Sequence, residues 1–243
     1  MMKNGINIWT AAMVGFGIAI AGWFVGHGFF QGRVADRFVT VKGVSEREVK
    51  ANVALWPLRF VSTDDDLSLA QAKIKESHEE ILDFLKNHGI DPAMAEIQRL
   101  EVTDRLADPY RTGPMQSRYI IAQTLMIRSN DPEAIAKASQ AVGELVDAEV
   151  VLSSRGGPYS GPTFLFTGLS ELKPDMIAEA TAKARRAAEQ FAKDSGSRIG
   201  RIRRANQGVF VIKPRDRAPG IIEGSQLYKT VRVVSTIEYY LKD

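Results

Sequence analysis

An alanine-rich segment with both ends marked constrains the fold of this chain more than any other part of the sequence. A helix is predicted over residues 174–196, because Pro174 suits a first helical turn and Gly196 can adopt the left-handed conformation that ends a helix. Small and apolar side chains recur along this helix at steps of three and four residues and therefore share one face. They are Ile177, Ala180, Thr181, Ala184, Ala187, Ala188 and Phe191. Because methyl groups dominate this stripe, the helix can lie close to a flat partner, and the β-rich segments around it predict that the partner is a sheet.

The N-terminal region, residues 1–30, carries no fixed charge from residue 6 to residue 30. About 20 such residues suffice to cross a bilayer as a helix, and aromatic side chains such as Trp23 favour the membrane interface. We therefore expect an uncleaved transmembrane anchor over residues 6–30, in contact with the lipid bilayer, and a linker over residues 31–37. The alternatives are a buried soluble helix and a signal peptide cleaved after Ala21, although the apolar run continues past that position. Basic residues flank both ends, so the charges leave the orientation open.

Composition excludes several classes of protein. The chain has no cysteine, which rules out disulfides, thiol catalysis and cysteine-ligated metals. Its charged and hydrophobic fractions, 25% and 44%, are ordinary for a globular protein and argue against a disordered chain. The net charge of +3 is small and the basic residues are interspersed with acidic ones, so no nucleic-acid partner is predicted.

Hydrophobic periodicity over residues 38–243 predicts an α+β domain. Strand pairs alternate with three helices in the order ββ-α-ββ-α-ββ-α-ββ. The predicted strands are residues 38–42, 49–62, 94–106, 118–128, 149–153, 162–167, 199–212 and 231–241, with a polar turn over residues 43–48. The predicted helices are residues 67–88, 132–146 and 174–196. Each helix would cover one face of the antiparallel strand pairs, in one domain or in two similar lobes.

Two predicted strands carry marks of their position in a sheet. Pro57 interrupts the strand at residues 49–62, and because proline cannot donate a ladder hydrogen bond, we expect an edge strand or a bulge there. The strand at residues 118–128 is apolar on both faces, which indicates a central position in the sheet.

No catalytic residue, cofactor site or metal site is predicted. Asp64, Asp65 and Asp66 could form a cation site, but Asp66 is well placed to cap the helix that follows and the other two favour its positive N-terminal end. His78 and His88 lie about 15 Å apart along that helix, too far to share a metal or a proton. The sequence therefore favours capping carboxylates, surface histidines and a protein that is not an enzyme.

Two further motifs have both a functional and a structural interpretation. Four arginines around the strand at residues 199–212 could hold phosphate or lipid headgroups, but they alternate with apolar residues and lack an interleaved aromatic ladder, which favours a solvated sheet face. They are Arg198, Arg201, Arg203 and Arg204. Gly156 and Gly157 could begin a phosphate loop, but no Lys-Ser/Thr pair follows them, so a turn is expected.

Three packing motifs carry a resemblance to a known family: the strand start at residues 39–43, the strand at residues 119–127, and the alanine helix with its closing glycines. The helix motif comprises Ala180, Ala184, Ala187, Ala188, Ala192, Gly196, Ile199 and Gly200. On these motifs the chain resembles the SIMPL-domain family, which includes bacterial periplasmic immunogenic proteins and oxidative-stress defence proteins. The resemblance extends over about residues 38–241. The chain departs from it at Ser45 and Lys50, where the family often has a glycine and an acid.

The resemblance implies a domain on the periplasmic side of a bacterial inner membrane, an N-terminus in the cytoplasm, and self-association into rings or hollow assemblies. The leading hypothesis is therefore a membrane-anchored, non-enzymatic envelope protein that forms a homo-oligomer through strand edges and exposed helix faces. The charged face of the alanine helix would be either solvated or used between subunits. It comprises Lys183, Arg185, Arg186, Glu189 and Lys193.

Two other hypotheses compete with this one. The first is a monomeric periplasmic binding or adaptor module in the envelope stress response, which presents the loops at residues 108–117 and 213–226 to an envelope protein or a ligand. The second is a hydrolase that uses Asp64, Asp65 and Asp66 with a cation.

Overall fold

The computed structural model describes residues 8–34, 37–107, 117–153 and 161–242, and the chain divides into two compact units. Unit 1 comprises Met1–Ser45, Asp175–Val209 and Val233–Asp243, and unit 2 comprises Glu46–Pro174 and Phe210–Arg232. Two long strands, β1 (Phe38–Lys50) and β8 (Tyr228–Lys242), contribute residues to both units.

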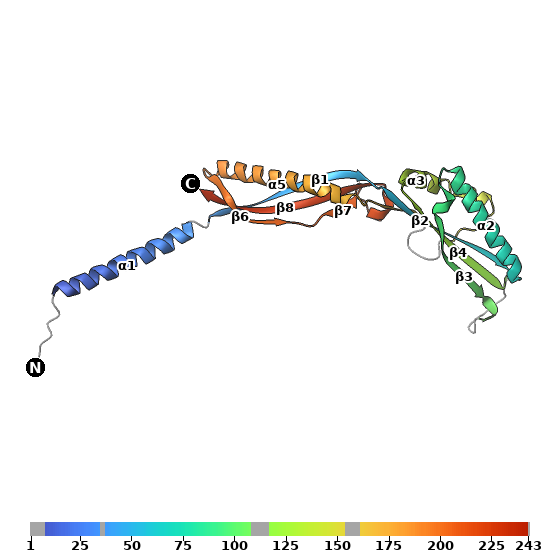
Figure 1. Cartoon of the computed structure of the whole chain (residues 1–243), viewed down its shortest axis with the longest axis horizontal. Coiled ribbons are helices and arrows are strands. Elements are labelled where there is room, and N and C mark those ends of the chain that lie inside the picture. Colours follow the sequence, from blue (N-terminus) through green and yellow to red (C-terminus); the bar gives the residue numbers. More distant parts are fainter. Residues whose placement is uncertain (1–7, 35–36, 108–116, 154–160, 243) are drawn as a thin grey trace, which may run out of the picture. The chain divides into compact units, whose positions relative to one another are not determined.

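Unit 1 is built on sheet A, in which β8 lies between β1 and β6 (Arg198–Gln207). The short strand β7 (Val211–Pro214) pairs with the first part of β8. Helix α5 (Leu169–Asp194) lies along one face of this sheet (Figure 1). Ala184 and Ala188 are fully buried there against a small core that includes Val39 of β1 and Ile237 of β8. The predicted partner of the alanine stripe, a sheet, is thus confirmed.

The close approach of α5 depends on a glycine in β1. A Cβ atom on Gly43 would lie 1.8 Å from the carbonyl oxygen of Ala180. The backbone of the helix therefore rests directly on the backbone of the strand. The polar turn predicted over residues 43–48 is wrong, because these residues continue β1 and Gly43 serves this contact.

The C-terminus of α5 was predicted correctly and its N-terminus was not. Gly196 has φ +70°, its N–H donates to Lys193 O at 3.2 Å, and the Ser197 N–H donates to Ala192 O at 2.8 Å. This is the Schellman pattern of a helix end. The helix begins five residues earlier than predicted, at Leu169, so that Pro174 lies inside it.

The buried row of α5 is also narrower than predicted. Its buried residues follow each other at steps of four: Met176, Ala180, Ala184, Ala188 and Ala192. Ala187 is exposed and Phe191 is 50% exposed. A single row at steps of four is one ridge of the helix surface, and this ridge is the part of α5 that is buried.

Unit 2 is built on sheet B, with strands in the order β3 (Ala95–Asp104), β4 (Tyr119–Ser129), β2 (Val53–Asp64) and β5 (Thr163–Leu165). Helix α2 (Leu67–Asn87) packs on β2 and β4, and α3 (Pro132–Gln140) and α4 (Gly143–Asp147) complete the unit (Figure 1). Short turns of 3-10 helix among the described residues are η1 (Pro92–Met94), η2 (Arg105–Ala107) and η3 (Glu223–Ser225). The core of unit 2 includes the fully buried side chains of Trp56, Phe60, Leu85 and Leu125.

Proline 57 occupies a local gap in the pairing of β2. The strand is central, because β4 pairs with it on one side and β5 on the other. Pro57 lies opposite Met126 without a register shift, whereas β5 pairs only with Val53, Ala54 and Leu55. On that side the next contact is the isolated bridge between Phe60 and Leu152. The missing N–H therefore faces a stretch without a ladder partner among the described strands, but the prediction of an edge strand or a bulge is wrong, because β2 is central and its pairing with β4 is regular.

The element order differs from the prediction in its second half. The observed order after α1 is ββ-α-ββ-αα-β-α-βββ. The predicted strand at residues 149–153 forms only the bridge at Leu152, and the helix predicted over residues 132–146 breaks before Gly143. The strand predicted over residues 199–212 is split into β6 and β7 near Gly208, whose N–H donates to Val234 O.

The predicted transmembrane anchor over residues 6–30 is wrong. The N-terminal helix α1 is Ile8–Val34, and within the described part of the chain no helix is long and apolar enough to cross a membrane. The prediction relied on the absence of charge, but glycines, which add no apolar side chain, recur along α1 at positions 15, 17, 22 and 26. The predicted single-pass location in a bacterial inner membrane, with a cytoplasmic N-terminus and a periplasmic domain, depended on this anchor and is wrong for the same reason.

Candidate functional site

The three adjacent aspartates are each engaged by a different neighbour. Asp66 caps α2 by accepting hydrogen bonds from the N–H groups of Ser68 and Leu69 at 2.7 and 3.2 Å. Asp65 accepts from the Arg118 N–H at 3.0 Å. The predicted cap is confirmed, and the carboxylates are directed toward separate partners rather than toward one point.

Asp64 forms an ion pair with Lys73 of α2 at 2.8 Å and accepts the Asp66 N–H at 3.1 Å. The Lys73 hydrogen bond, helped by that backbone N–H, lowers the pKa of the Asp64 carboxyl. Among the described residues, no group of three or more His, Asp or Glu side chains is arranged to hold a metal ion. The aspartates organise the junction between β2, α2 and β4.

His78 of α2 and His88, the C-cap residue of that helix, lie apart, as predicted, but both are half-buried rather than on the surface. His88 is 3.0 Å from Glu144 of α4, and its ring lies 4.4 Å from that of Phe84. His78 Nδ1 lies 2.9 Å from the side-chain nitrogen of Gln123 on β4. Each ring therefore joins α2 to a different element.

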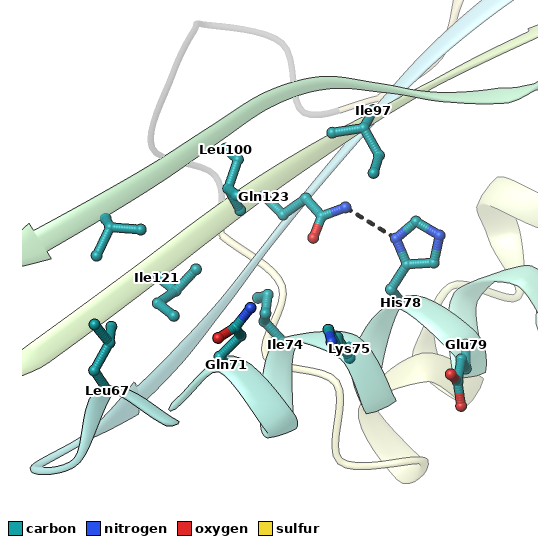
Figure 2. A pocket seen from close by; sticks show the side chains of 11 residues that line it. Leu67, Gln71, Ile74, Lys75, His78, Glu79, Ile97, Leu100, Ile121 and Gln123 are labelled. Atoms are coloured by element: carbon teal, nitrogen blue, oxygen red, sulfur yellow. Dashed lines mark hydrogen bonds between the residues drawn. The ribbon is translucent and has the colours of Figure 1, made fainter. Parts of the chain in front are cut away.

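An apolar groove of about 490 Å³ lies between α2 and sheet B. Figure 2 shows side chains of α2, β3 and β4 on its facing walls. On α2 the lining positions recur at steps of three and four, so they share one helix face. They are Leu67, Gln71, Ile74, Lys75, His78 and Glu79. On the sheet the lining residues are Ile97, Leu100 and Val102 of β3 and Ile121 and Gln123 of β4.

The outer wall of this groove is an uncovered strand face. Helix α2 packs on β2 and β4, and the apolar side chains of β3 are left largely exposed. The exposed fractions are 60% for Ile97, 58% for Leu100 and 55% for Val102. We refer to these three residues as the β3 apolar face. An apolar sheet face is normally buried against another layer, so this surface is suited to a partner.

The groove has one polar contact in its floor. Gln123 is buried, and its side-chain nitrogen lies 2.9 Å from Nδ1 of His78 (Figure 2). Neither Lys75 nor Glu79 hydrogen-bonds to His78 in the part of the chain that the structure describes. The groove thus combines apolar walls with the His78–Gln123 contact and with Gln71, Lys75 and Glu79 on its α2 side.

Strand β3 is also an edge of sheet B, since only β4 pairs with it among the described strands. Its register with β4 shifts between Ile97 and Arg99. Ion pairs surround it, at 2.8 Å from Arg59 to Glu101 and at 2.8 Å from Arg118 to Asp104. The Arg118 hydrogen bond lowers the pKa of the Asp104 carboxyl. Charges limit indiscriminate pairing of an exposed edge but do not remove its hydrogen-bonding groups.

The β3 apolar face is the site that the sequence interpretation missed. The register shift changes the phase of the strand, so that apolar residues fall at 97, 100 and 102 instead of at every second position. These three residues do not follow the strict alternation that identifies one face of a regular strand. Their spacing with one extra residue, which is typical of a bulged strand, is the signal that points to a common face.

The two loops predicted as binding elements are only partly described. Residues 108–116 and the Gly156–Gly157 motif lie outside the described residues. Two hydrogen bonds cross the loop at residues 213–226. The Asp216 N–H donates to the side-chain oxygen of Gln226 at 3.1 Å, and the side-chain amide of Gln226 donates to the Asp216 carbonyl oxygen at 3.0 Å. Arg215 lies over the ring of Tyr228 at 5.0 Å.

The four arginines of the basic segment belong to β6, and their partners come from other strands. Arg203 lies over the ring of Phe38, and Arg201 over the ring of Tyr240. The four arginines lie in unit 1 and do not line the groove, which belongs to unit 2.

Comparison with known proteins identifies one family. The model of SIMPL, described as a protein of unknown function (DUF541), matches residues 39–234. A search of curated proteins finds no match.

Proposed function

The chain belongs to the SIMPL family, and from this premise we propose that its domain is a non-enzymatic module that self-associates through the β3 apolar face. The observation that carries the proposal is the exposure of Ile97, Leu100 and Val102, each above half, on an edge strand that pairs on one side only among the described strands. Such a strand can extend its sheet by pairing with another strand, and the apolar side chains add burial to the new hydrogen bonds.

The sequence of β3 is suited to pairing with itself. Two copies related by a two-fold axis and paired antiparallel about Leu100 would place Arg99 of each opposite Glu101 of the other. The two-fold operation would also bring both β3 apolar faces to the same side of the joined sheet. Opposite charges facing each other would favour this register over its neighbours.

Other features of unit 2 make catalysis a weaker proposal. Asp64 and Asp66 are engaged by Lys73 and by the first turn of α2. The lowered pKa of Asp64 and the hydrogen bonds of both carboxylates fit structural roles, because a general acid or base must be directed at a substrate position.

Substitution of Leu100 by lysine tests the contact. A charge in the centre of the β3 apolar face should dissociate the oligomer, because it would have to be desolvated on assembly. Val146→Lys is the matched control, since Val146 is 60% exposed on α4 and lies outside the groove. The measurement is molar mass by light scattering behind size-exclusion chromatography. A wild-type protein that stays strictly monomeric, or equal behaviour of the two variants, contradicts the proposal.

The groove itself favours a second candidate, a binding module that accepts apolar groups of a different protein. Its volume of about 490 Å³ and the His78–Gln123 pair are typical of sites with apolar walls and few polar contacts. Cross-linking in cells separates the two functions. A ladder of self-linked chains supports self-association, whereas bands between unlike chains without such a ladder support the binding module.

A further inference from the structure

The face of sheet A opposite α5 collects basic side chains from three strands. In β1 and β8, the residues that pack toward α5 alternate with residues on the other face, as Val39 and Ile237 alternate with Phe38 and Glu238. Arginines of β6 reach the same outer face. Arg204 lies directly opposite Glu238 and Arg198 directly opposite Lys242, and such pairs share a face.

Two of these arginines are held against aromatic rings. The guanidinium of Arg203 lies 4.0 Å from the centre of the Phe38 ring and 3.0 Å from a carboxylate oxygen of Glu238. The guanidinium of Arg201 lies 5.5 Å from the centre of the Tyr240 ring. These contacts hold the charges on the outer face of the sheet and reduce the side-chain freedom that would be lost on binding.

The charge of this surface is strongly unbalanced. Among the described strand residues of unit 1, the outer face carries the acidic side chain of Glu238 and six basic side chains. We call these six residues the basic face. They are Lys42, Arg198, Arg201, Arg203, Arg204 and Lys242.

We propose that the basic face binds the phosphate headgroups of an anionic phospholipid surface. Guanidinium groups match phosphate oxygens in geometry and in charge, and several basic residues on one face attract an anionic surface together. Phe38 and Tyr240 add aromatic rings of the kind that favour a membrane interface. Single-stranded nucleic acid fits less well, because it requires free ring faces for base stacking, and arginines cover these two rings.

The test compares two vesicle types on the full chain. Binding is measured by co-sedimentation with vesicles of phosphatidylcholine alone and of phosphatidylcholine mixed with phosphatidylglycerol. The ratio of the two partition coefficients isolates the part of binding that depends on headgroup charge, whatever the apolar parts of the chain contribute to both. We expect the wild-type ratio to be well above one and to fall as salt is added.

Arg201→Gln with Arg204→Gln removes two charges from the basic face. Because each basic residue near an anionic surface contributes about fivefold, this variant should lose about 25-fold in binding to the anionic vesicles. The control, Arg186→Gln with Lys193→Gln, removes the same charge from exposed positions of α5. It should lose much less, and circular dichroism checks that both variants are folded.

Three outcomes overturn the proposal. The first is equal binding of the wild-type protein to both vesicle types. The second is an equal loss in the two variants, which would reflect net charge alone. The third is a loss of binding to a single-stranded oligonucleotide in Arg201→Gln with Arg204→Gln while vesicle binding is kept, which would assign the face to nucleic acid.

Discussion

At the scale of single residues, the fully buried Lys229 of β8 is the least expected side chain. Its ammonium group is paired with the carboxylate of Glu223 and donates to the Glu223 carbonyl oxygen at 2.6 Å. A buried charge is tolerated only when it is paired and hydrogen-bonded. This pair therefore ties η3 to β8 and positions the loop that precedes the strand.

Substitution of Glu223 by glutamine should lower the free energy of unfolding by about 2 kcal/mol, because it leaves Lys229 buried without its counter-charge while one backbone hydrogen bond remains. Glu46→Gln is the matched control. Glu46 of β1 pairs with Arg232 of β8, the strand that also carries Lys229. This pair is exposed and should contribute less than about 0.5 kcal/mol to the free energy of unfolding. Urea unfolding of both variants measures the difference. An equal loss of unfolding free energy in the two variants would show that the buried Lys229–Glu223 pair is no more stabilising than the exposed pair.

At the scale of elements, the contact between α5 and β1 decides the packing of unit 1. Gly43 allows the two backbones to meet, and two residues later Ser45 is fully buried and donates to the Glu179 carboxylate at 2.8 Å. A glycine and a hydroxyl on the inner face of β1 thus replace the usual layer of aliphatic side chains. Ser45 therefore has a structural role in this contact.

Substitution of Gly43 by alanine should cost about 3 kcal/mol, at the upper end for overpacking, because the atoms in the way are backbone atoms of α5. Gly143→Ala is the control, since nothing lies within 4 Å of an added Cβ there. That change should leave stability unchanged or raise it by up to about 1 kcal/mol, as expected for glycine replaced in a helix. Thermal unfolding followed by circular dichroism compares them. A small effect at Gly43 would mean that α5 can move away from the sheet.

At the scale of the whole molecule, the proposed contact surfaces lie in different units. The β3 apolar face belongs to unit 2, whereas the basic face and the charged outer face of α5 belong to unit 1. Separate cores support them, so each surface can be altered without disturbing the other.

Reversal of Arg185 and Arg186 to glutamate tests whether α5 takes part in assembly. Arg185 pairs with Glu189 at 2.9 Å, and this carboxylate raises the pKa of the guanidinium. Loss of an exposed pair at i, i+4 and its replacement by like charges should cost at most about 1 kcal/mol, so the fold should be kept. If β3 is the contact, light scattering should give the wild-type molar mass. Dissociation of the oligomer in this variant would show that α5, and not β3, forms the contact between subunits.

The local features of the fold followed from the sequence because each depends on a few neighbouring residues. The cap at Asp66 and the stop at Gly196, with φ of +70°, follow from the backbone preferences of those residues. The central position of β4 followed from its apolar residues on both faces. The absence of charge in residues 6–30 was a weaker guide, because lack of charge alone does not make a helix apolar enough to span a bilayer.

Only the tertiary structure decided which segments meet. The ring under Arg203 comes from β1 and the ring under Arg201 from β8, so β6 by itself showed arginines without an aromatic partner. The uncovered β3 apolar face depends on where α2 lies over sheet B, and the role of Gly43 depends on α5, far away in the sequence. Residue preferences determine turns and caps through local torsion angles. Strand order, bulges and the coverage of a sheet depend on contacts between distant segments, which no local pattern records.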